Sequence, residues 1–192
     1  LIPDKRVSRW VWVALIMSLS VVDAARGQNR TVTMSRQVGN ERSVEVNVQY
    51  GAGRVSVGPA ESGVLYHMQI EYDEDVFRPL AEYEGNSLRI GTESLGRRFR
   101  IGRDRWAGEM KLALSRDVAM DLNMDFGAVR AEIDLGGIRL TRLEINTGAS
   151  QTVIDISEPN PETMSKASMD VGAAEFTVLN LGNLNTSVIE IN

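Results

Sequence analysis

His67 is the single histidine of this 192-residue chain, and the chain contains no cysteine. Zinc sites are built from several histidine, cysteine or carboxylate ligands, so a histidine-based zinc site is not available. A serine–histidine–aspartate triad would have to use His67, yet no serine stands in a Gly-x-Ser-x-Gly sequence. The sequence therefore predicts that His67 lies on a strand face, with no metal, no cofactor and no catalytic centre around it.

An acidic run follows the histidine, formed by Glu71, Asp73, Glu74 and Asp75. Clustered carboxylates suggest calcium, but the run lacks the ligand spacing and the turning glycine of an EF-hand loop. Charged residues also protect exposed strand edges from unwanted pairing. We therefore interpret the run as a solvated strand end or edge.

Five aspartates further along lie on or beside segments that alternate like strands. Each stands next to an apolar residue expected to face inward, so each aspartate should point outward. In some β-helix enzymes paired carboxylates on one face act on polysaccharides by acid–base chemistry. Sequence does not reveal whether two of these aspartates line up across strands, and a solvated acidic face is the simpler interpretation. The five are Asp121, Asp125, Asp134, Asp155 and Asp170.

The most suggestive polar segment combines five arginines with Phe99, Ile101 and Trp106. Arginine binds phosphate and carboxylate groups through paired hydrogen bonds, so the segment could hold phosphate, lipid head groups or an acidic glycan. It could equally pair with the acidic residues of the same chain. The five arginines are Arg97, Arg98, Arg100, Arg103 and Arg105.

The charge distribution argues against nucleic acid as a partner. The whole chain has a net charge of −5. Residues 106–192 hold six basic and thirteen acidic side chains, so this half is strongly acidic. Phosphate contacts dominate nucleic-acid affinity and require a basic surface, which excludes this class of partner.

Residues 1–27 have the layout of a secretory signal peptide. Basic residues precede an uncharged apolar run over 10–22, and small residues before Gln28 offer a cleavage site. The run is shorter than the roughly 20 residues that a spanning helix needs, although an uncleaved anchor is the alternative. No cysteine follows it, which excludes a lipoprotein anchor. We therefore expect an exported protein that is periplasmic, displayed on the cell surface or secreted.

The strongest pattern is a Gly-Ala pair that interrupts strand-like alternation four times. The apolar residues stand at even positions before the first pair, as in Val46 and Val48, and at odd positions after it, as in Val55 and Val57. The parity changes at every pair, which indicates a corner that keeps apolar side chains inward. Glycine suits such a corner because it tolerates positive φ and close backbone approach. The predicted structural corners are Gly51, Gly127, Gly148 and Gly172.

The last three of these corners lie 21 and 24 residues apart, a period typical of a stacked β coil. We therefore predict an all-β, solenoid-like fold of the β-helix type. Its parts would be a polar leader over 28–42, a less regular N-terminal β part over 43–105 and repeated coils over 106–192.

Three further patterns complete this map. Residues 83–90 alternate around Gly85-Asn86, which predicts a hairpin. Two prolines in 158–162 cannot serve a central strand ladder, so this segment should be an exposed loop. The pattern of 135–146 recurs 46 residues later at 181–192, or two coils on. Because the second copy stops in mid-coil, we expect the natural chain to continue beyond Asn192 or a neighbouring molecule to cover that end.

The order of these motifs resembles the bacterial toast-rack family. The resemblance rests on YGAG, then SRDVAMDLNMDFGA, DLGGIRLTRLEINTGAS and MDVGAAEFTVLNLGN, and extends over roughly 43–192. It implies an exported or membrane-attached β-solenoid domain of uncharacterised function, without known catalytic residues. Related domains end cell-wall-antibiotic response membrane proteins, and others are grouped with adhesins. This chain lacks the multi-span segment of the membrane proteins.

Taken together, these features predict a non-catalytic cell-envelope binding or scaffold module, adhesin-like, that displays loops such as 96–105 and 159–162. The expected partner is an envelope protein or glycan. Membrane contact would arise only through an uncleaved N-terminus or the arginine segment. The alternatives are a carbohydrate-active enzyme that uses paired carboxylates, and a structural unit that self-associates through its C-terminal coil.

Overall fold

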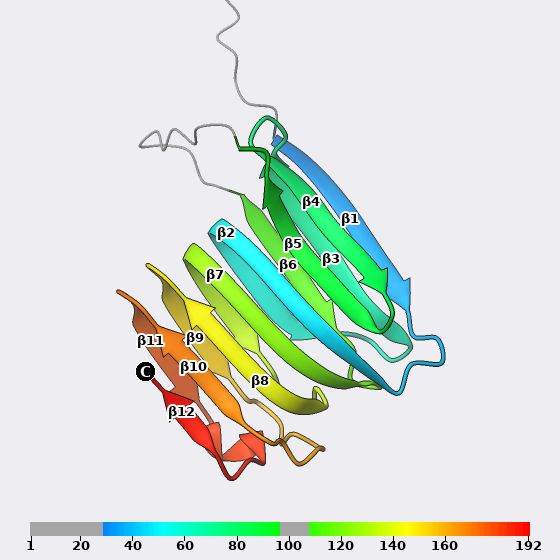
Figure 1. Ribbon diagram of the computed structural model, residues 1–192, viewed down its shortest axis with the longest axis vertical. Coiled ribbons are helices and arrows are strands. Elements are labelled where there is room, and N and C mark those ends of the chain that lie inside the picture. Colours follow the sequence, from blue (N-terminus) through cyan, green and yellow to red (C-terminus); the bar gives the residue numbers. More distant parts are fainter. Residues whose placement is uncertain (1–28, 97–107) are drawn as a thin grey trace, which may run out of the picture.

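A computed structural model describes residues 29–96 and 108–192 of the chain, which form a stack of β-strands (Figure 1). The described residues hold twelve strands and one short 3-10 helix, η1. In chain order the elements are β1 Asn29–Gln37, β2 Ser43–Pro59, β3 Val64–Asp73, β4 Phe77–Glu84, β5 Ser87–Ser94, β6 Glu109–Leu114, β7 Ala119–Asp134, β8 Leu140–Thr147, β9 Gln151–Asp155, β10 Ala167–Val171, β11 Glu175–Leu179, η1 Leu181–Leu184 and β12 Ile189–Ile191.

Two long strands, β2 and β7, each contribute to both sides of the stack. Their first halves pair with β5 and β8, and their second halves pair with β6 and β9. We name the two sides sheet A and sheet B. Sheet A consists of β4, β5, the first halves of β2 and β7, β8, β10 and β12. Sheet B consists of β1, β3, β6, the second halves of β2 and β7, β9 and β11. This arrangement is the predicted all-β, solenoid-like architecture.

The order of coils in space differs from their order in the chain. Strand β2 lies between the coil of β5 and β6 on one side and β7 on the other. Its parallel pairing with β7 runs from Ser43 opposite Ala119 to Val57 opposite Ile133. Strands β2 to β5 and β6 to β12 therefore belong to one continuous stack, in which β3, β4 and β5 precede the regular coils in the chain.

The two ends of the stack differ. At one end the antiparallel strands β4, β3 and β1 follow the parallel coils, and β4 joins β5 through a turn in which Gly85 and Asn86 both have positive φ. The hairpin predicted for 83–90 is thereby confirmed. At the other end β11 and β12 are the last strands of sheets B and A. We call these ends the head and the tail.

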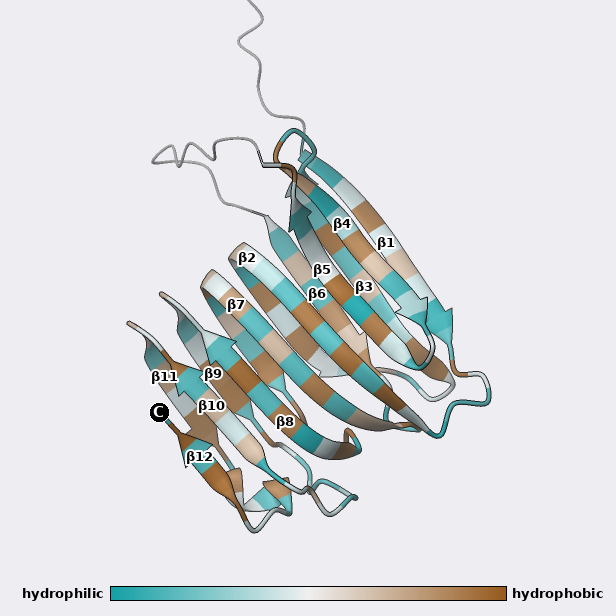
Figure 2. Cartoon of the chain, viewed as in Figure 1, coloured by the Kyte–Doolittle hydropathy of each residue, from teal (hydrophilic) through white to brown (hydrophobic). Residues whose placement is uncertain are grey.

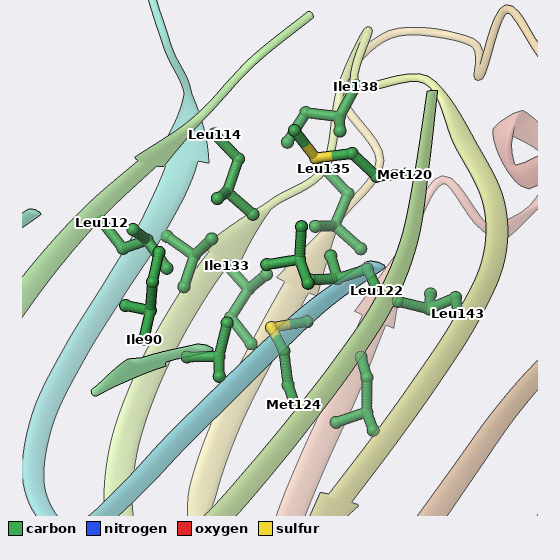
Figure 3. Close-up of a cluster of buried hydrophobic side chains, with 14 of the residues drawn as sticks. Ile90, Leu112, Leu114, Met120, Leu122, Met124, Ile133, Leu135, Ile138 and Leu143 are labelled. Atoms are coloured by element: carbon green, nitrogen blue, oxygen red, sulfur yellow. The ribbon is translucent and has the colours of Figure 1, made fainter. Parts of the chain in front are cut away.

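The core lies between the two sheets and follows the predicted change of parity. Val46 and Val48 are buried before the first corner, and Val55 and Val57 are buried after it. The hydrophobic residues therefore form bands that cross the strands of the stack (Figure 2). Figure 3 shows buried side chains of both sheets in one cluster. Met124 comes before the corner at Gly127 in the chain, and Ile133 and Leu135 come after it.

Three of the four predicted corner glycines, Gly127, Gly148 and Gly172, lie where stacked corners come very close together, whereas a Cβ on Gly51 would meet only the Phe77 ring, at 4.0 Å. A Cβ built on Gly127 would lie 2.2 Å from the carbonyl oxygen of Gly51. A Cβ built on Gly148 would lie 3.1 Å from the carbonyl oxygen of Gly127, and one built on Gly172 would lie 3.0 Å from the carbonyl oxygen of Gly148. None of the four has a positive φ. Close approach, rather than backbone conformation, therefore selects glycine here.

A further close approach is made at Gly91 of β5, which no Gly-Ala pair marks. It has φ 135°, and a Cβ there would lie 1.7 Å from the carbonyl oxygen of Gln49. Gln49 and Gly91 are partners in the ladder between β2 and β5. The coil nearest the head thus uses glycine for both close approach and positive φ.

Arg36, Glu41 and Tyr83 link the two sheets at the head. The guanidinium group of Arg36 donates to Glu41 Oε1 over 2.9 Å and stacks 4.1 Å from the centre of the Tyr83 ring. Gly39 N also donates to Glu41 Oε2 over 2.5 Å. The hydrogen bond from Arg36, followed by those from backbone N–H groups, lowers the pKa of Glu41 to about 2. These contacts tie β1 and the turn after it to β4.

Replacing Gly127 with alanine should destabilise the stack, since the new methyl group meets the backbone of the neighbouring corner. We expect Gly127→Ala to lower the free energy of unfolding by about 1–3 kcal/mol in guanidinium titrations. Gly182→Ala is the matched control, because a Cβ at Gly182 meets nothing within 4 Å. Equal stability of the two variants would contradict the steric account of the corners.

The contribution of Glu41 to stability should depend on pH. Because its pKa is lowered to about 2, its stabilising effect is complete above its ordinary value of 4.5 and disappears as the pH falls toward 2. Glu41→Gln should therefore lower the melting temperature near neutral pH, and the gap from the parent chain should close in strong acid. A gap that stays constant across this range would show that the carboxylate is not the cause.

Candidate interaction surface

The five arginines that the sequence singles out for anion binding lie outside the described residues. Arg97, Arg98, Arg100, Arg103 and Arg105 all fall within 97–107. Their binding to phosphate, lipid or acidic glycan therefore stays a prediction. The candidate surfaces described below are formed by other residues.

His67 lies exposed on β3, on the outer side of sheet B. Its ladder partners are Ser35 of β1 and Ala113 of β6, and neither is acidic. Among residues 29–96 and 108–192, no three histidine, cysteine or carboxylate side chains are grouped so that they could hold a metal ion. Within these described residues, His67 is a side chain on the exposed face of a strand.

The acidic run after His67 joins β1 to the end of β3. Asn29 Nδ2 donates to Glu71 Oε1 over 3.0 Å, and Arg30 pairs with Glu74 at 2.5 Å. Asp73 Oδ1 accepts a hydrogen bond from the backbone N–H of Asp75 over 3.0 Å, which closes the turn toward β4. These contacts give the run a structural role at the head of the stack.

The ladder register decides which of the five outward aspartates meet. Asp134 lies opposite Asp155 across β7 and β9, so these two form a carboxylate pair on neighbouring strands. Asp125 and Asp170 instead flank the same residue of β8, Asn146. The remaining one, Asp121, is the ladder partner of Arg142. Among these five aspartates, Asp134 and Asp155 are therefore the one pair that are direct ladder partners.

Both members of that pair accept hydrogen bonds that hold loops in place. The hydroxyl of Ser157 donates to Asp134 Oδ1 over 2.7 Å, and the backbone N–H of Gly136 donates to it over 2.9 Å. Burial alone would raise the pKa of Asp134, but these hydrogen bonds outweigh burial and lower it. Asp155 accepts from Asn180 Nδ2 over 2.7 Å. A general acid needs a raised pKa, so Asp134 is poorly suited to that role.

The outer side of sheet A carries a continuous polar surface across β2, β7, β8 and β10. The outward ladder positions of these four strands hold polar or charged side chains, except for Ala119 at the start of β7. Amides and carboxylates repeat from strand to strand, at a spacing of about 4.8 Å. We call this set the polar face, and its members are Glu45, Asn47, Gln49, Asp121, Asn123, Asp125, Arg142, Glu144, Asn146, Ser168 and Asp170.

The centre of the polar face is partly desolvated. Burial raises the pKa of Asp121, Arg142 opposes this, and the neighbouring carboxylates of Glu45 and Glu144 raise it further. The side-chain oxygen of Asn123 is buried and has no hydrogen-bond partner in the described structure. Leaving a buried acceptor without a partner costs free energy.

Some polar contacts already order this surface. Asn47 Nδ2 donates to Glu45 Oε1 over 3.1 Å, and Arg142 Nη2 donates to Glu144 Oε2 over 3.1 Å. These pairs join residues two apart on one strand, so they restrict the side chains without linking strands. The sequence marks only the aspartates of this surface; alternation would also have placed Asn47, Asn123 and Asn146 there, but amides in strands give no signal of their own.

The loop over 158–162 is exposed at Glu158, Pro159 and Pro161, as predicted, and its display to a partner stays a prediction. Asn160 is buried, with 3% of its surface accessible. Its Nδ2 donates to the carbonyl oxygens of Leu140 and Leu184 over 2.8 and 3.1 Å. Its Oδ1 accepts from the backbone N–H groups of Leu140 and Glu162 over 3.0 and 3.2 Å. The amide therefore joins three successive loops of the stack.

Neighbouring polar side chains continue this support. Asn183 Nδ2 donates to the carbonyl oxygen of Ile156 over 2.8 Å, and Asn185 Nδ2 donates to that of Glu162 over 2.8 Å. The acidic residues at both ends of the loop, Glu158 and Glu162, form ion pairs with Arg116 and Arg139. The two prolines exclude a strand here, as expected, while asparagines fasten the resulting loop to the coils beside it.

The family model described as the N-terminal domain of toast_rack matches residues 23–179. The chain belongs to the toast-rack family. Membership agrees with the stacked coils and corner glycines, and confirms the resemblance drawn from the sequence motifs. A search of curated proteins found no match.

One solved structure supports the fold at low identity. A candidate cell adhesion protein from Clostridium sporogenes is 13% identical, with a TM-score of 0.63, over 86% of this chain and 98% of that one. A candidate adhesin from Parabacteroides merdae is 14% identical, with a TM-score of 0.33, over 86% of this chain and 78% of that one. At such identity the first similarity establishes the fold alone. No helix in the described parts of the chain is long and apolar enough to span a membrane.

Removing the Asn160 amide should loosen three loops together, because several buried backbone groups lose their partner. We expect Asn160→Ala to lower the free energy of unfolding by about 1–3 kcal/mol, measured by denaturant titration. Asn29→Ala serves as the control, since that side chain makes its hydrogen bond to Glu71 on the exposed surface. If both variants lose the same small amount, the loop is not held by Asn160.

Proposed function

We propose that this toast-rack protein is a non-catalytic, adhesin-like binding module of the bacterial cell envelope. The observation that carries the proposal is the polar face, a surface built on parallel strands and free of apolar side chains. An exported location is part of the proposal, supported by the signal-like layout of residues 1–27. The name of the Clostridium sporogenes neighbour as a candidate cell adhesion protein agrees with such a role.

Glycan is the partner that the chemistry of the polar face favours. Protein interfaces usually concentrate affinity in buried aromatic and aliphatic anchors, which this surface lacks. Sugar hydroxyl and acetamido groups instead match the alternating amides and carboxylates, such as Gln49, Asp125 and Asn146 in one cross-strand row. The excess of carboxylates disfavours polyanions, so we infer a neutral or amino-sugar polymer.

Rigidity would serve this function. The ladders from β2 to β10 hold the side chains at fixed intervals, so little entropy is lost when an extended polymer binds. An extended polymer can contact several of these positions at once, so many weak contacts together give a higher apparent affinity. A flat surface with regular spacing therefore suits a cell-wall polysaccharide better than a small molecule, which needs a concave pocket.

A carbohydrate-active enzyme is the second candidate, favoured by the juxtaposition of Asp134 and Asp155. Their existing hydrogen bonds argue for the structural role described above. The two candidates are separable, because an enzyme would release new reducing ends from a polysaccharide, and the release would cease in Asp134→Asn and Asp155→Asn.

The proposal can be tested by sedimenting the purified chain with insoluble chitin and with peptidoglycan. We expect binding that falls at least about tenfold in the double variant Asn47→Ala/Asn146→Ala, because each lost hydrogen-bonding amide weakens recognition by roughly 1 kcal/mol. The matched control, Gln69→Ala/Gln151→Ala, removes two amides from the outer side of sheet B. Equal losses in both double variants, or no binding by the parent chain, would contradict the assignment of the polar face.

A further inference from the structure

The polar face consists of three rows of side chains that cross the strands, and the row nearest the corners differs from the other two. Each member of this row stands two residues before a corner glycine, so its members share one line beside the corners. Neighbouring members lie about 4.8 Å apart, one on each of the strands β2, β7, β8 and β10 (Figure 1). We call this set the corner row, and its members are Gln49, Asp125, Asn146 and Asp170.

The other two rows of the polar face are largely occupied by contacts within the chain. Glu45 accepts a hydrogen bond from Asn47, and Glu144 accepts one from Arg142. The side-chain oxygen of Asn123 is buried, so a ligand on the surface does not reach it. These two rows therefore retain little hydrogen-bonding capacity for a partner.

The corner row keeps most of its hydrogen-bonding capacity. Within residues 29–96 and 108–192, the side chains of Gln49, Asp125 and Asn146 make no hydrogen bond or ion pair. Gln49 and Asp125 are exposed, and Asn146 is half-buried. The chain continues from this row into the Gly-Ala corners, where the exposed Ala128 and Ala149 carry only a methyl group. These corners therefore leave one side of the row open to a ligand.

The side chains of the corner row alternate between amide and carboxylate. A carboxylate only accepts hydrogen bonds, whereas an amide can donate, so Asp125 is an acceptor between the possible donors Gln49 and Asn146. An acetamido group has one N–H and one carbonyl oxygen, which match a carboxylate and a neighbouring amide. The row already contains a contact of this kind, since Asn192 Nδ2 donates to Asp170 Oδ1 over 2.7 Å. Hydrogen bonds to a carboxylate are stronger than those between neutral groups, which favours a ligand with amide N–H donors.

The geometry of the polar face also sets the direction of a bound polymer. A polymer that crosses the strands meets a corner-row side chain about every 4.8 Å, a distance comparable to the length of one pyranose residue. A polymer that follows one strand meets outward side chains roughly 6.6 Å apart, and most of these belong to the occupied rows. The first direction therefore offers successive sugars a polar partner with free hydrogen-bonding capacity.

We propose that the corner row binds a linear N-acetylated amino-sugar polymer that runs along the stack, across the strands. This inference rests on the proposed function and narrows it to one row of the polar face and one class of glycan. An acetamido group over Asp125 and Asn146 donates its N–H to the carboxylate and accepts from the amide. The next sugars on either side contact Gln49 and Asp170, so affinity rises with the length of the polymer.

Calorimetric titration of the purified full chain with soluble oligomers of β-1,4-linked N-acetylglucosamine tests this proposal. We expect the hexamer to bind at least about tenfold more tightly than the dimer, because it contacts more of the row. A glucose hexamer with the same linkage lacks acetamido groups and should bind at least about tenfold more weakly than the N-acetylated hexamer.

Single variants locate the binding row. Asp125→Ala and Asn146→Ala should each weaken binding of the N-acetylated hexamer at least about fivefold, since each removes a hydrogen-bonding partner. Glu45→Ala and Asn47→Ala are the matched controls, because they remove the same types of group from the occupied rows. Binding by these two variants should stay close to that of the parent chain.

The outcomes separate this inference from the proposed function. Losses confined to the two corner-row variants support both. Equal losses in all four variants overturn the corner row but leave the polar face as the binding surface, and equal affinity for the two hexamers overturns the role of acetamido groups. If the parent chain binds neither these oligomers nor insoluble chitin and peptidoglycan, the proposed function fails and this inference fails with it. Circular dichroism of the four variants checks that lost binding does not reflect unfolding.

Discussion

The parallel backbone ladder between successive coils is the interaction on which the rest of the structure depends. Strands β5, β2, β7, β8, β10 and β12 pair in parallel in this order, with one register shift between β7 and β8 at Met120/Asp121, and inward positions stay inward along the stack. Strands can stack closely at the corners because glycine has no side chain, as where the carbonyl oxygen of Gly51 lies against the Cα of Gly127. With no cysteine in the chain, backbone hydrogen bonds and apolar burial must hold the stack together.

The same ladder creates the surface to which we assign function. Because side chains alternate, a strand that delivers Met124 to the core must present Asn123 and Asp125 to solvent. Repetition of that strand then turns single polar residues into rows. Polar residues on the outer side of the stack differ in what they bind within the chain. Asp134, which lies outside the polar face, holds a loop, whereas Asn47 of the polar face donates to Glu45 on its own strand.

The two ends of the described stack are built differently. At the head, antiparallel strands, a proline and ion pairs lie beside the last parallel coil. At the tail, the inward residue Ile191 of β12 is 55% exposed, whereas its counterpart in β8, Ile145, is fully buried. The stack therefore differs from one end to the other, although its middle repeats.

The sequence by itself determined the local features: the change of parity at each Gly-Ala corner, the hairpin at Gly85-Asn86 and the absence of a strand between the two prolines. These follow from the two-residue period of strands and from steric limits, which act on neighbouring residues. Only the tertiary structure decided that β2 lies between β5 and β7, that Asp134 meets Asp155 and that Asn160 is buried. Such contacts depend on the register between distant segments, which is set by the packing of the whole stack and leaves no local trace in the chain.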